Sequence, residues 1–349
     1  MNEIVAALTG TVGEACARFS SAEAVSAGGA WNARLWSALD QIGVCSIAVP
    51  EELGGAGGDL RTAVAVLETL GRYAAGVPLA EHALLAGWLL SECGAPVPPG
   101  PLTAAVAGPD FVLTPAEGGW SATGTLSRVP WARHAVGTVV LAGDHVVLLR
   151  PGDFVLDPGT NLAGEPRDGA TLDGRIIPGD RVHGIRPMGA EAMFRDRAAV
   201  ARVALMSGAA GNALDLTVAY AAEREQFGRP LAKFQAVQQH LAAMAGEVLL
   251  IKVAAEAAAL AIDSGGDPAV PVAAARAAAG EAAGVVCTLA HQVHGAIGFT
   301  EEHPLRHSTT RLWAWRDEGG SESRWAARLG ARVLEAAPGG LWPLLTGSE

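Results

Sequence analysis

The second half of the chain consists of four long stretches that keep a helical period and are separated by short breaks. Arg202 to Glu223 contains no proline, and Ala232 to Ile262 places its large apolar residues along one stripe. Pro271 to His294 and Pro304 to Glu335 complete the set. Because the breaks are short, neighbouring helices are expected to be antiparallel. The pattern predicts a four-helix bundle.

The residues before this bundle are expected to form a helical domain and a small β domain. Val64, Leu67 and Leu70 lie three residues apart, which is typical of a helix that buries one face. The stretch VGTVVLAGDHVVLLR holds two β-branched runs around Gly143 and Asp144, a strong hairpin signal. We therefore predict a mainly α fold with a small β domain. The predicted domains are an N-terminal helical domain (1–100), a middle β domain (101–187) and a C-terminal four-helix bundle (188–349).

The charge of the chain argues against binding to nucleic acid. Its 349 residues carry a formal net charge of −11, and no run of Lys or Arg offers a basic face to a polyanion. The N-terminus lacks a basic segment followed by an apolar one, and no run of about 18 uncharged apolar residues is present to cross a membrane. The four cysteines form no CxxC pair, so neither disulfides nor zinc are indicated. We expect a cytoplasmic protein without membrane association.

The stretch AYAAEREQFGRPLAKFQ places a charge, an amide and an aromatic ring where one helix ends and the next begins. Arg224, Gln226 and Phe227 carry these groups. A guanidinium matches phosphate as a bidentate fork, so the pattern favours a grip on a flat, anionic ligand. The alternative is a helix cap, in which Arg224 completes the helix dipole and Phe227 fills the core.

A second stretch, QVHGAIGFTEEHPL, follows the third long helix. The order of the three domains, together with both stretches, resembles the acyl-CoA dehydrogenase family over essentially the whole chain. The resemblance implies FAD as the cofactor. In relatives the first stretch of one subunit holds the pyrophosphate and adenosine half of an FAD that belongs to a neighbouring active site, and the second stretch approaches its adenine and ribose. The cofactor-binding residues implied in this way are Arg224, Gln226, Phe227, Gln292, Gly295 and Ala296, the last of which is often glycine in relatives.

Histidines near the second stretch admit two interpretations. His291 and His294 lie three apart on one helix face, and His303 and His307 follow. They are numerous enough for a metal cluster, but no HExxH-like spacing accompanies them. We expect hydrogen bonds from these side chains to backbone or cofactor, and we predict no metal site.

The reaction implied by the resemblance is α,β-dehydrogenation of an acyl-CoA thioester, as in β-oxidation and lipid metabolism. A carboxylate removes the α proton, the β hydrogen leaves as hydride to the flavin, and the electrons pass to an electron-transfer flavoprotein. In some relatives this base precedes an Arg that matches Arg202, where the present chain has Ala201. Arg202 is the predicted substrate-binding residue.

In other relatives the base lies in a turn that corresponds to WRDEGGSESRW, and this match nominates Glu318 as the catalytic base. Counting without a gap from Gly295 places Gly319 at that position instead. On a helix one residue is about 100° of rotation, whereas a turn tolerates such a shift. Glu318 is therefore either the base or a structural carboxylate.

The β domain lacks motifs that hold the flavin ring in homotetrameric relatives. It contains no Thr-Glu-Pro segment, and Arg128 and Pro130 stand where a Trp and a Thr are expected. In this respect the chain resembles the shorter subunit of heteromeric, actinobacterial-type acyl-CoA dehydrogenases. We expect a homo-oligomer or a heteromer with a longer chain, and the sequence does not fix the acyl group. The alternatives are a non-catalytic structural subunit that completes the FAD site of its partner, a self-sufficient homo-oligomer that uses Glu318, and a flavin monooxygenase or nitroalkane-oxidising relative.

Overall fold

The computed structural model describes residues 3–21, 25, 30–185, 189–336 and 342, and its contacts divide the chain into two compact units. The bundle unit contains Met1–Ala27, Leu60–Ala75 and Ala199–Glu349. The sheet unit contains Gly28–Asp59 and Gly76–Ala198. The division into three domains stays a prediction, and its boundary at 187/188 lies outside the described residues.

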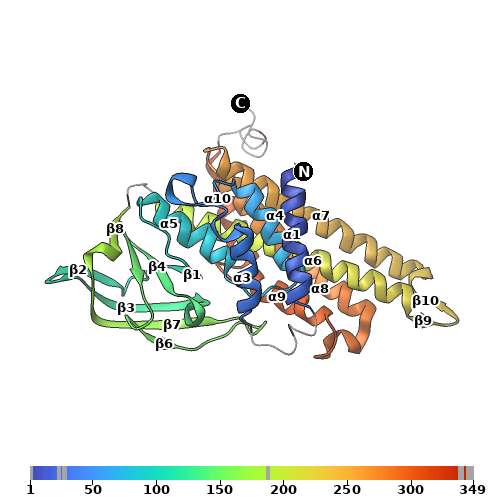
Figure 1. Ribbon diagram of the computed structural model, residues 1–349. Helices are drawn as coiled ribbons and strands as arrows, with labels where there is room; N and C mark the ends of the chain where they lie inside the picture. Colours follow the sequence, from blue (N-terminus) through green and yellow to red (C-terminus); the bar gives the residue numbers. More distant parts are fainter. Residues whose placement is uncertain (1–2, 22–24, 26–29, 186–188, 337–341, 343–349) are drawn as a thin grey trace. The chain divides into compact units, whose positions relative to one another are not determined.

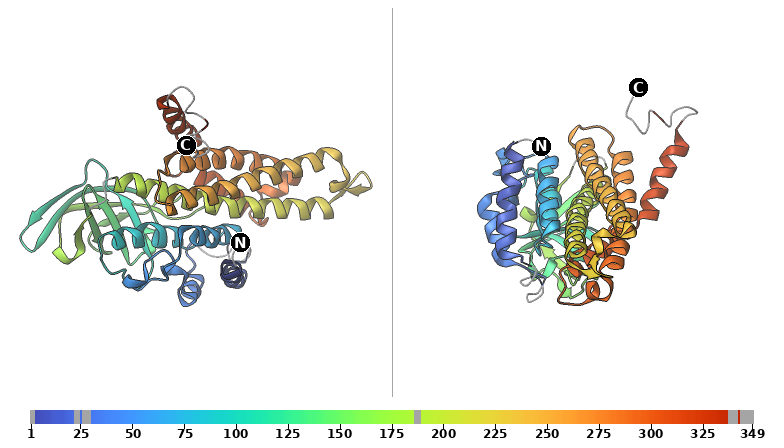
Figure 2. Two further views of the ribbon diagram at one scale, coloured as in Figure 1. Left: turned by 90° about the horizontal axis from the view of Figure 1, so that it is seen from above. Right: turned by 90° about the vertical axis from the view of Figure 1, so that its right-hand side faces the viewer.

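Helices make up almost all of the bundle unit. The long helices α6, α7 and α8 run side by side in Figures 1 and 2, and a two-stranded hairpin connects α6 to α7. The predicted bundle is confirmed. Its helices are α1 (Glu3–Phe19), α4 (Leu60–Arg72), α6 (Ala190–Glu223, in this unit from Ala199 on), α7 (Gln235–Asp263), α8 (Ala269–His294), α9 (Leu305–Asp317) and α10 (Glu322–Glu335). The hairpin strands are β9 (Glu225–Gln226) and β10 (Arg229–Pro230).

Helix α8 lies in the core of the bundle unit. Its buried residues extend from Val270 to His294 and are mostly alanine and valine, as expected for a helix that is covered on most of its surface. An exposed stripe of the helix contains Glu281, Thr288 and Gln292. The stretch Ala269–Phe299 is long and apolar enough to cross a membrane, with a mean hydropathy of 1.3, but 61% of the window is buried in the structure. A helix in the core of a protein can be equally long and apolar. The absence of membrane association therefore stays a prediction.

The fourth predicted helix, Pro304 to Glu335, is wrong as a single element. Helix α9 ends at Asp317 and α10 begins at Glu322. Between them Gly319 has a φ of +72° and Gly320 a φ of +117°. Such angles are incompatible with a right-handed helix and favour glycine, so this pair ends α9 and turns the chain.

The sheet unit contains two four-stranded sheets. In the first, the strand order is β1-β4-β5-β8, with β1 parallel to β4; in the second it is β2-β3-β7-β6, and all pairs are antiparallel. Helices α3 (Ala33–Ile42) and α5 (Gly87–Glu92) belong to the same unit, and a π-helix (Ala80–Ala86) precedes α5. The strands are β1 (Leu102–Val106), β2 (Val112–Ala116), β3 (Gly119–Pro130), β4 (Gly137–Ala142), β5 (His145–Leu149), β6 (Val155–Asp157), β7 (Arg167–Ile177) and β8 (Val182–Gly184).

The β4–β5 hairpin confirms the predicted turn and separates two apolar cores. Ala142 pairs with His145, so Gly143 and Asp144 form the two-residue connection. Along β4 the side chains alternate between the two faces of the sheet. Val139 packs in a core with the π-helix and α5, whereas Val140 packs in a core with the second sheet.

Two glycines bring α4 and α6 into backbone contact. A Cβ placed on Gly208 of α6 would lie 1.8 Å from the Glu68 carbonyl oxygen, and one on Gly71 of α4 would lie 2.1 Å from the Leu205 carbonyl oxygen. Neither position has room for a side chain, because the obstructing atoms belong to rigid helical backbone. This contact therefore fixes where α6 crosses α4.

We predict that Gly208→Ala lowers the free energy of unfolding by about 3 kcal/mol, because the methyl group forces the two helices apart. Gly246→Ala on α7 is the matched control. A Cβ there meets no atom within 4 Å, so we expect a gain of about 0.5 kcal/mol from helix propensity. Urea unfolding followed by circular dichroism measures both. Equal stability of Gly208→Ala and the wild type would contradict the contact.

Candidate functional site

Residues from both motifs line one cavity in the bundle unit. The cavity has a volume of about 360 Å³ and lies where α6 and α8 end. The structure thus brings together four of the six predicted cofactor residues, although the two motifs are far apart in the sequence. Phe227 and Ala296 are not among its lining residues, which are Tyr220, Arg224, Gln226, Leu231, Val237, His240, Gln292, Val293, His294 and Gly295.

The β9–β10 hairpin presents Phe227 to the exterior. Gln226 pairs with Arg229, so Phe227 and Gly228 form a two-residue turn with φ values of +52° and +76°. A positive φ is unusual for a bulky side chain, and the Phe227 side chain is 90% exposed. The alternative that Phe227 fills the core is therefore wrong. An exposed ring held in a strained turn is typical of a contact surface.

The cavity is lined by one arginine and by no carboxylate. Arg224 is exposed at its edge, and no Asp or Glu is among the lining residues, although the chain as a whole has a net charge of −11. Helices α6 and α8 both direct their C-terminal ends to this place, and the partial negative charge of those ends opposes an anion. Arg224 is the positive group that offsets this charge, so the predicted anion grip depends on it.

Gly295 allows α8 to end at the cavity. Its φ of +65° and ψ of −148° belong to a region that essentially only glycine adopts. A Cβ at this position would meet no atom within 4 Å, so backbone conformation, and not crowding, requires the glycine. The open space beside Gly295 lets a ligand approach the main chain.

Two histidines lie in the last turn of α8, and one of them, His294, lines the cavity. His294 stacks on the Tyr220 ring at 4.5 Å and donates from Nδ1 to the Ala290 carbonyl at 2.8 Å. His291 stacks on Phe299 at 3.9 Å, and its Nε2 is 3.0 Å from the Thr309 hydroxyl. The expected hydrogen bonds to backbone are thus present for His294. Among the described residues no group of three or more His, Cys, Asp or Glu is arranged to hold a metal ion.

Burial lowers the pKa of each histidine in this cluster. Burial is the main cause for His291, His294 and His303, and for the first two neighbouring histidines contribute as well. For His307, burial together with Arg311 and Arg306 lowers the pKa to about 4. These rings are therefore neutral in the folded chain at neutral pH.

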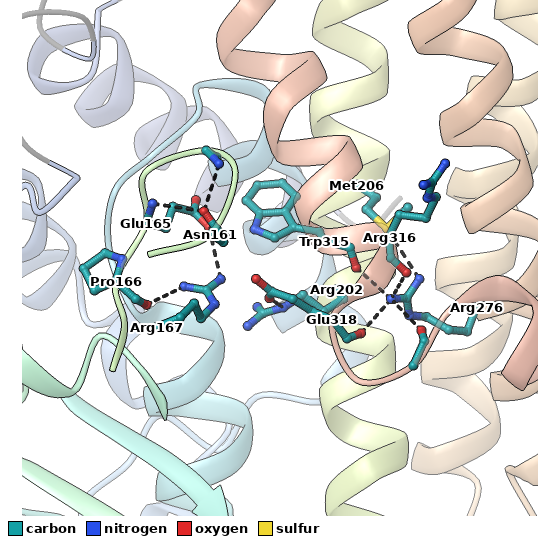
Figure 3. Close-up of polar contacts among 12 residues, drawn as sticks. Asn161, Glu165, Pro166, Arg167, Arg202, Met206, Arg276, Trp315, Arg316 and Glu318 are labelled. Atoms are coloured by element: carbon teal, nitrogen blue, oxygen red, sulfur yellow. Dashed lines mark hydrogen bonds and ion pairs between the residues drawn. The ribbon is translucent and has the colours of Figure 1, made fainter. Parts of the chain in front are cut away.

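Glu318, the predicted base, is held by an ion pair with Arg202. The Nε atom of Arg202 on α6 lies 2.8 Å from Oε2 of Glu318, and the two side chains are 11% and 12% exposed. Figure 3 shows the Glu318 side chain directed towards Arg202. Ala201, at the position that supplies the base in other relatives, is buried and has no titratable group. The structure thus pairs the predicted substrate-binding residue with the predicted base.

A residue that the sequence analysis did not single out lies beside this pair. The Arg276 side chain is 0% exposed, and its guanidinium faces the backbone carbonyls at the end of α9, including that of Glu318 (Figure 3). Burial, followed by repulsion from Arg202, lowers the pKa of Arg276 to about 10, so it remains charged at neutral pH. The sequence signal is an arginine with three alanines on each side in α8.

The cavity and the Glu318 turn lie at opposite ends of the same two helices. Arg202 and Tyr220 are 18 positions apart on α6, as are Arg276 and His294 on α8. At 1.5 Å per residue each interval spans about 27 Å. A cofactor held by its phosphates at Arg224 therefore cannot place its reactive ring at Glu318 of the same chain.

Two family models match this chain. The one described as "Acyl-CoA dehydrogenase, C-terminal domain" matches residues 190–333. The one described as "Acyl-CoA dehydrogenase, N-terminal domain" matches residues 6–96. Together they cover the helical parts at both ends of the chain and include every predicted site residue.

Similar proteins and structures cover most of the chain. Acyl-CoA dehydrogenase IpdE2 of Mycolicibacterium smegmatis is 31% identical over 313 residues, which are 88% of this chain and 88% of that protein. Acyl-CoA dehydrogenase FadE27 of Mycobacterium tuberculosis is 32% identical over 303 residues, which cover 78% of this chain and 80% of that protein. A chain in the crystal structure of the ChsE4-ChsE5 complex from Mycobacterium tuberculosis superposes with a TM-score of 0.88 at 25% identity, covering 97% of this chain and 99% of that one. The predicted fold is confirmed.

We predict that acid weakens the bundle unit. The pKa of His307 is about 4 when folded and 6.5 ordinarily, so the unfolded chain binds more protons between these values. The stabilisation is complete above pH 6.5 and is lost as the pH falls to 4, with His307 contributing about 1 to 2 kcal/mol after allowance for its partial exposure. Urea unfolding midpoints between pH 7.5 and 4.5 measure this loss.

The variant His307→Gln should show a flatter dependence of stability on pH than the wild type. His183→Gln, in the sheet unit, is the control for the loss of a histidine elsewhere. If His307→Gln and the wild type lose the same unfolding free energy as the pH falls, protonation of His307 does not cause the acid sensitivity.

Proposed function

Because this chain belongs to the acyl-CoA dehydrogenase family, we propose that it forms part of an FAD-dependent enzyme that dehydrogenates an acyl-CoA thioester, and that its cavity at Arg224 holds the adenosine diphosphate half of FAD. The observation that carries this proposal is the convergence of Arg224, Gln226, Gln292 and Gly295 on one cavity without a carboxylate. A guanidinium and two amides are the groups that can bind the pyrophosphate, ribose and adenine of this half of FAD.

Each of these residues has a distinct part in holding the cofactor. The Arg224 guanidinium donates to the pyrophosphate oxygens, and charge-assisted bonds of this kind are among the strongest available. The amides of Gln226 and Gln292 can donate to and accept from the ribose and adenine edges. At Gly295 the main chain lies open to the ligand. The exposed Phe227 ring packs on a flat apolar surface supplied by the cofactor or by a neighbouring chain.

Glu318 is the proposed acceptor of the substrate α proton. When bound, FAD supplies the acceptor for the hydride that leaves the β carbon, and its electrons pass on to an electron-transfer flavoprotein. Arg202 orients the Glu318 carboxylate before the reaction. For Glu318 to take up the proton, its carboxylate must therefore leave Arg202 or contact the substrate while it stays paired with Arg202.

The distance between the two places supports a site shared between subunits. Because about 27 Å of helix separates them, the FAD bound at Arg224 and the proton acceptor at Glu318 belong to two different active sites. This requires a second copy or a longer partner chain. The ChsE4-ChsE5 structure, to which the chain is similar over nearly its whole length, is a complex of two named components. We therefore propose that the chain works as an oligomer, in a heteromer with a longer acyl-CoA dehydrogenase.

The ion pair itself favours a second candidate function. A carboxylate held 2.8 Å from a guanidinium, with both groups largely buried, is also the arrangement of a purely structural pair. In that case the chain is a non-catalytic subunit that completes the FAD site of its partner. The two functions make different predictions for Glu318 and the same prediction for Arg224.

We predict that Arg224→Ala weakens FAD binding by about 2 kcal/mol, roughly 30-fold, because a charge-assisted contact to phosphate is lost. The measurement is titration of the deflavinated complex, which contains this chain and the partner that purifies with it. Arg229→Ala, in the same hairpin but outside the cavity lining, is the control and should bind FAD nearly as well as the wild type. If the FAD affinity of Arg224→Ala equals that of the wild type, Arg224 does not contact the phosphates.

We predict that Glu318→Gln leaves FAD binding intact and slows bleaching of the flavin by acyl-CoA at least about 100-fold, since an amide cannot accept the proton. Stopped-flow absorbance of the complex measures the rate. Glu322→Gln, four residues further on, is the control for loss of a carboxylate near the turn. Wild-type bleaching in Glu318→Gln would favour the non-catalytic subunit.

A further inference from the structure

We infer that Arg276 is the positioning residue for Glu318: its buried guanidinium holds the turn from Trp315 to Gly320, and thereby sets where the Glu318 carboxylate stands. The inference rests on the proposed function in one respect, namely that Glu318 accepts a proton. It concerns a residue of α8 that belongs to neither motif.

One nitrogen atom makes most of the contacts. Nη2 of Arg276 lies 2.7 Å from the carbonyl oxygens of Trp315, Arg316 and Glu318, and 3.4 Å from that of Gly320. Its two N–H groups are shared among these acceptors. The last carbonyls of a helix have no partner within the helix, and here they converge on a single cation. The guanidinium therefore closes α9 and also binds the turn that follows it.

The conformation of the turn leaves backbone carbonyls directed at this cation. Gly319 and Gly320 have positive φ values, so the chain leaves the helix without the hydrogen bonds that would continue it. Carbonyl dipoles that point at one place repel one another unless a donor lies between them. With Arg276 fully buried, water cannot fill the position without rearrangement.

Glu318 is thus held at two points by two arginines. Arg202 binds its side chain at 2.8 Å, and Arg276 binds its main-chain carbonyl at 2.7 Å. The first contact orients the carboxylate, and the second fixes the backbone from which the carboxylate extends. If only the first remained, the side chain would keep its partner but the turn would be free to move.

The buried charge of Arg276 is balanced locally. Glu318, Asp317 and Glu322 favour its charged form, and Arg202 disfavours it. Its Nη1 lies 3.9 Å from the Met206 sulfur, and its Nε has no hydrogen-bond partner among the described residues. Because the contacts concentrate on Nη2, we expect one cationic nitrogen that bears N–H groups to hold the turn. A lysine ammonium has three such groups on a chain one bond shorter.

The test compares Arg276→Met, Arg276→Gln and Arg276→Lys in the flavin-loaded complex. The exchange rates of the amides in 316–321 report on the turn directly, whether or not the enzyme turns over. FAD content and the rate of flavin bleaching by acyl-CoA are recorded on the same samples. Arg332→Met is the control, because this exposed arginine of α10 pairs with Asp267 away from the turn.

We expect Arg276→Met to speed amide exchange in the turn roughly 10-fold or more. We also expect it to slow bleaching roughly 100-fold with FAD content unchanged, because a small displacement of the proton acceptor is costly. Arg276→Lys should recover most of both losses, and Arg332→Met should match the wild type. If Arg276→Met does not fold, the inference requires Arg276→Lys to lie closer to the wild type than Arg276→Gln in both measurements.

Wild-type exchange in Arg276→Met, or equal behaviour of the Lys and Gln variants, would overturn the inference. Faster exchange with unchanged bleaching would also overturn it, since the placement of Glu318 would then be irrelevant to the reaction. A wild-type complex without flavin, or one that acyl-CoA does not bleach, would instead contradict the proposed function. In that event the exchange rates would still decide whether Arg276 holds the turn.

Discussion

The burial of helix α8 is the constraint on which the rest of the bundle unit depends. Most of the helix surface is buried and apolar, and the helix carries one fully buried charge, Arg276. That charge is tolerated because the end of α9 and the following turn bring backbone carbonyls to it. At the other end of α8, Gly295 stops the helix beside an open cavity. A single core helix thus fixes both the Glu318 turn and the Arg224 cavity.

The Glu318 turn and the Arg224 cavity are joined by α6 and α8, and about 27 Å of each helix separates them. The arginines at the two places differ in their surroundings: Arg224 is exposed beside the cavity, whereas Arg202 pairs with Glu318 and Arg276 is fully buried against backbone carbonyls. The proposed binding of an anionic cofactor by this acidic chain rests on a cavity without carboxylates, and not on the total charge. In this proposal, the spacing assigns the cavity to a neighbouring active site.

The cavity could be predicted from the sequence, but the hold on the Glu318 turn could not. Arg224 and Gln292 belong to continuous motifs at helix ends, where a polar side chain close to glycines indicates a ligand that approaches the main chain. Arg276 is a lone residue among alanines, and its partners come from residues some forty positions later that were expected to continue a helix. Because that helix breaks at Gly319 and Gly320, the one-residue ambiguity at Glu318 concerns a turn, where helical rotation does not decide the direction of a side chain.

The central claim is that this chain supplies one part of an FAD site shared with another subunit. The direct measurement is FAD per chain, from visible absorbance, for the chain expressed alone and together with a longer acyl-CoA dehydrogenase chain. The account predicts a colourless or weakly coloured lone chain, and a mixed complex that holds flavin at fewer than one per chain and is bleached by acyl-CoA. A monomeric lone chain with one FAD, bleached by acyl-CoA, would contradict it.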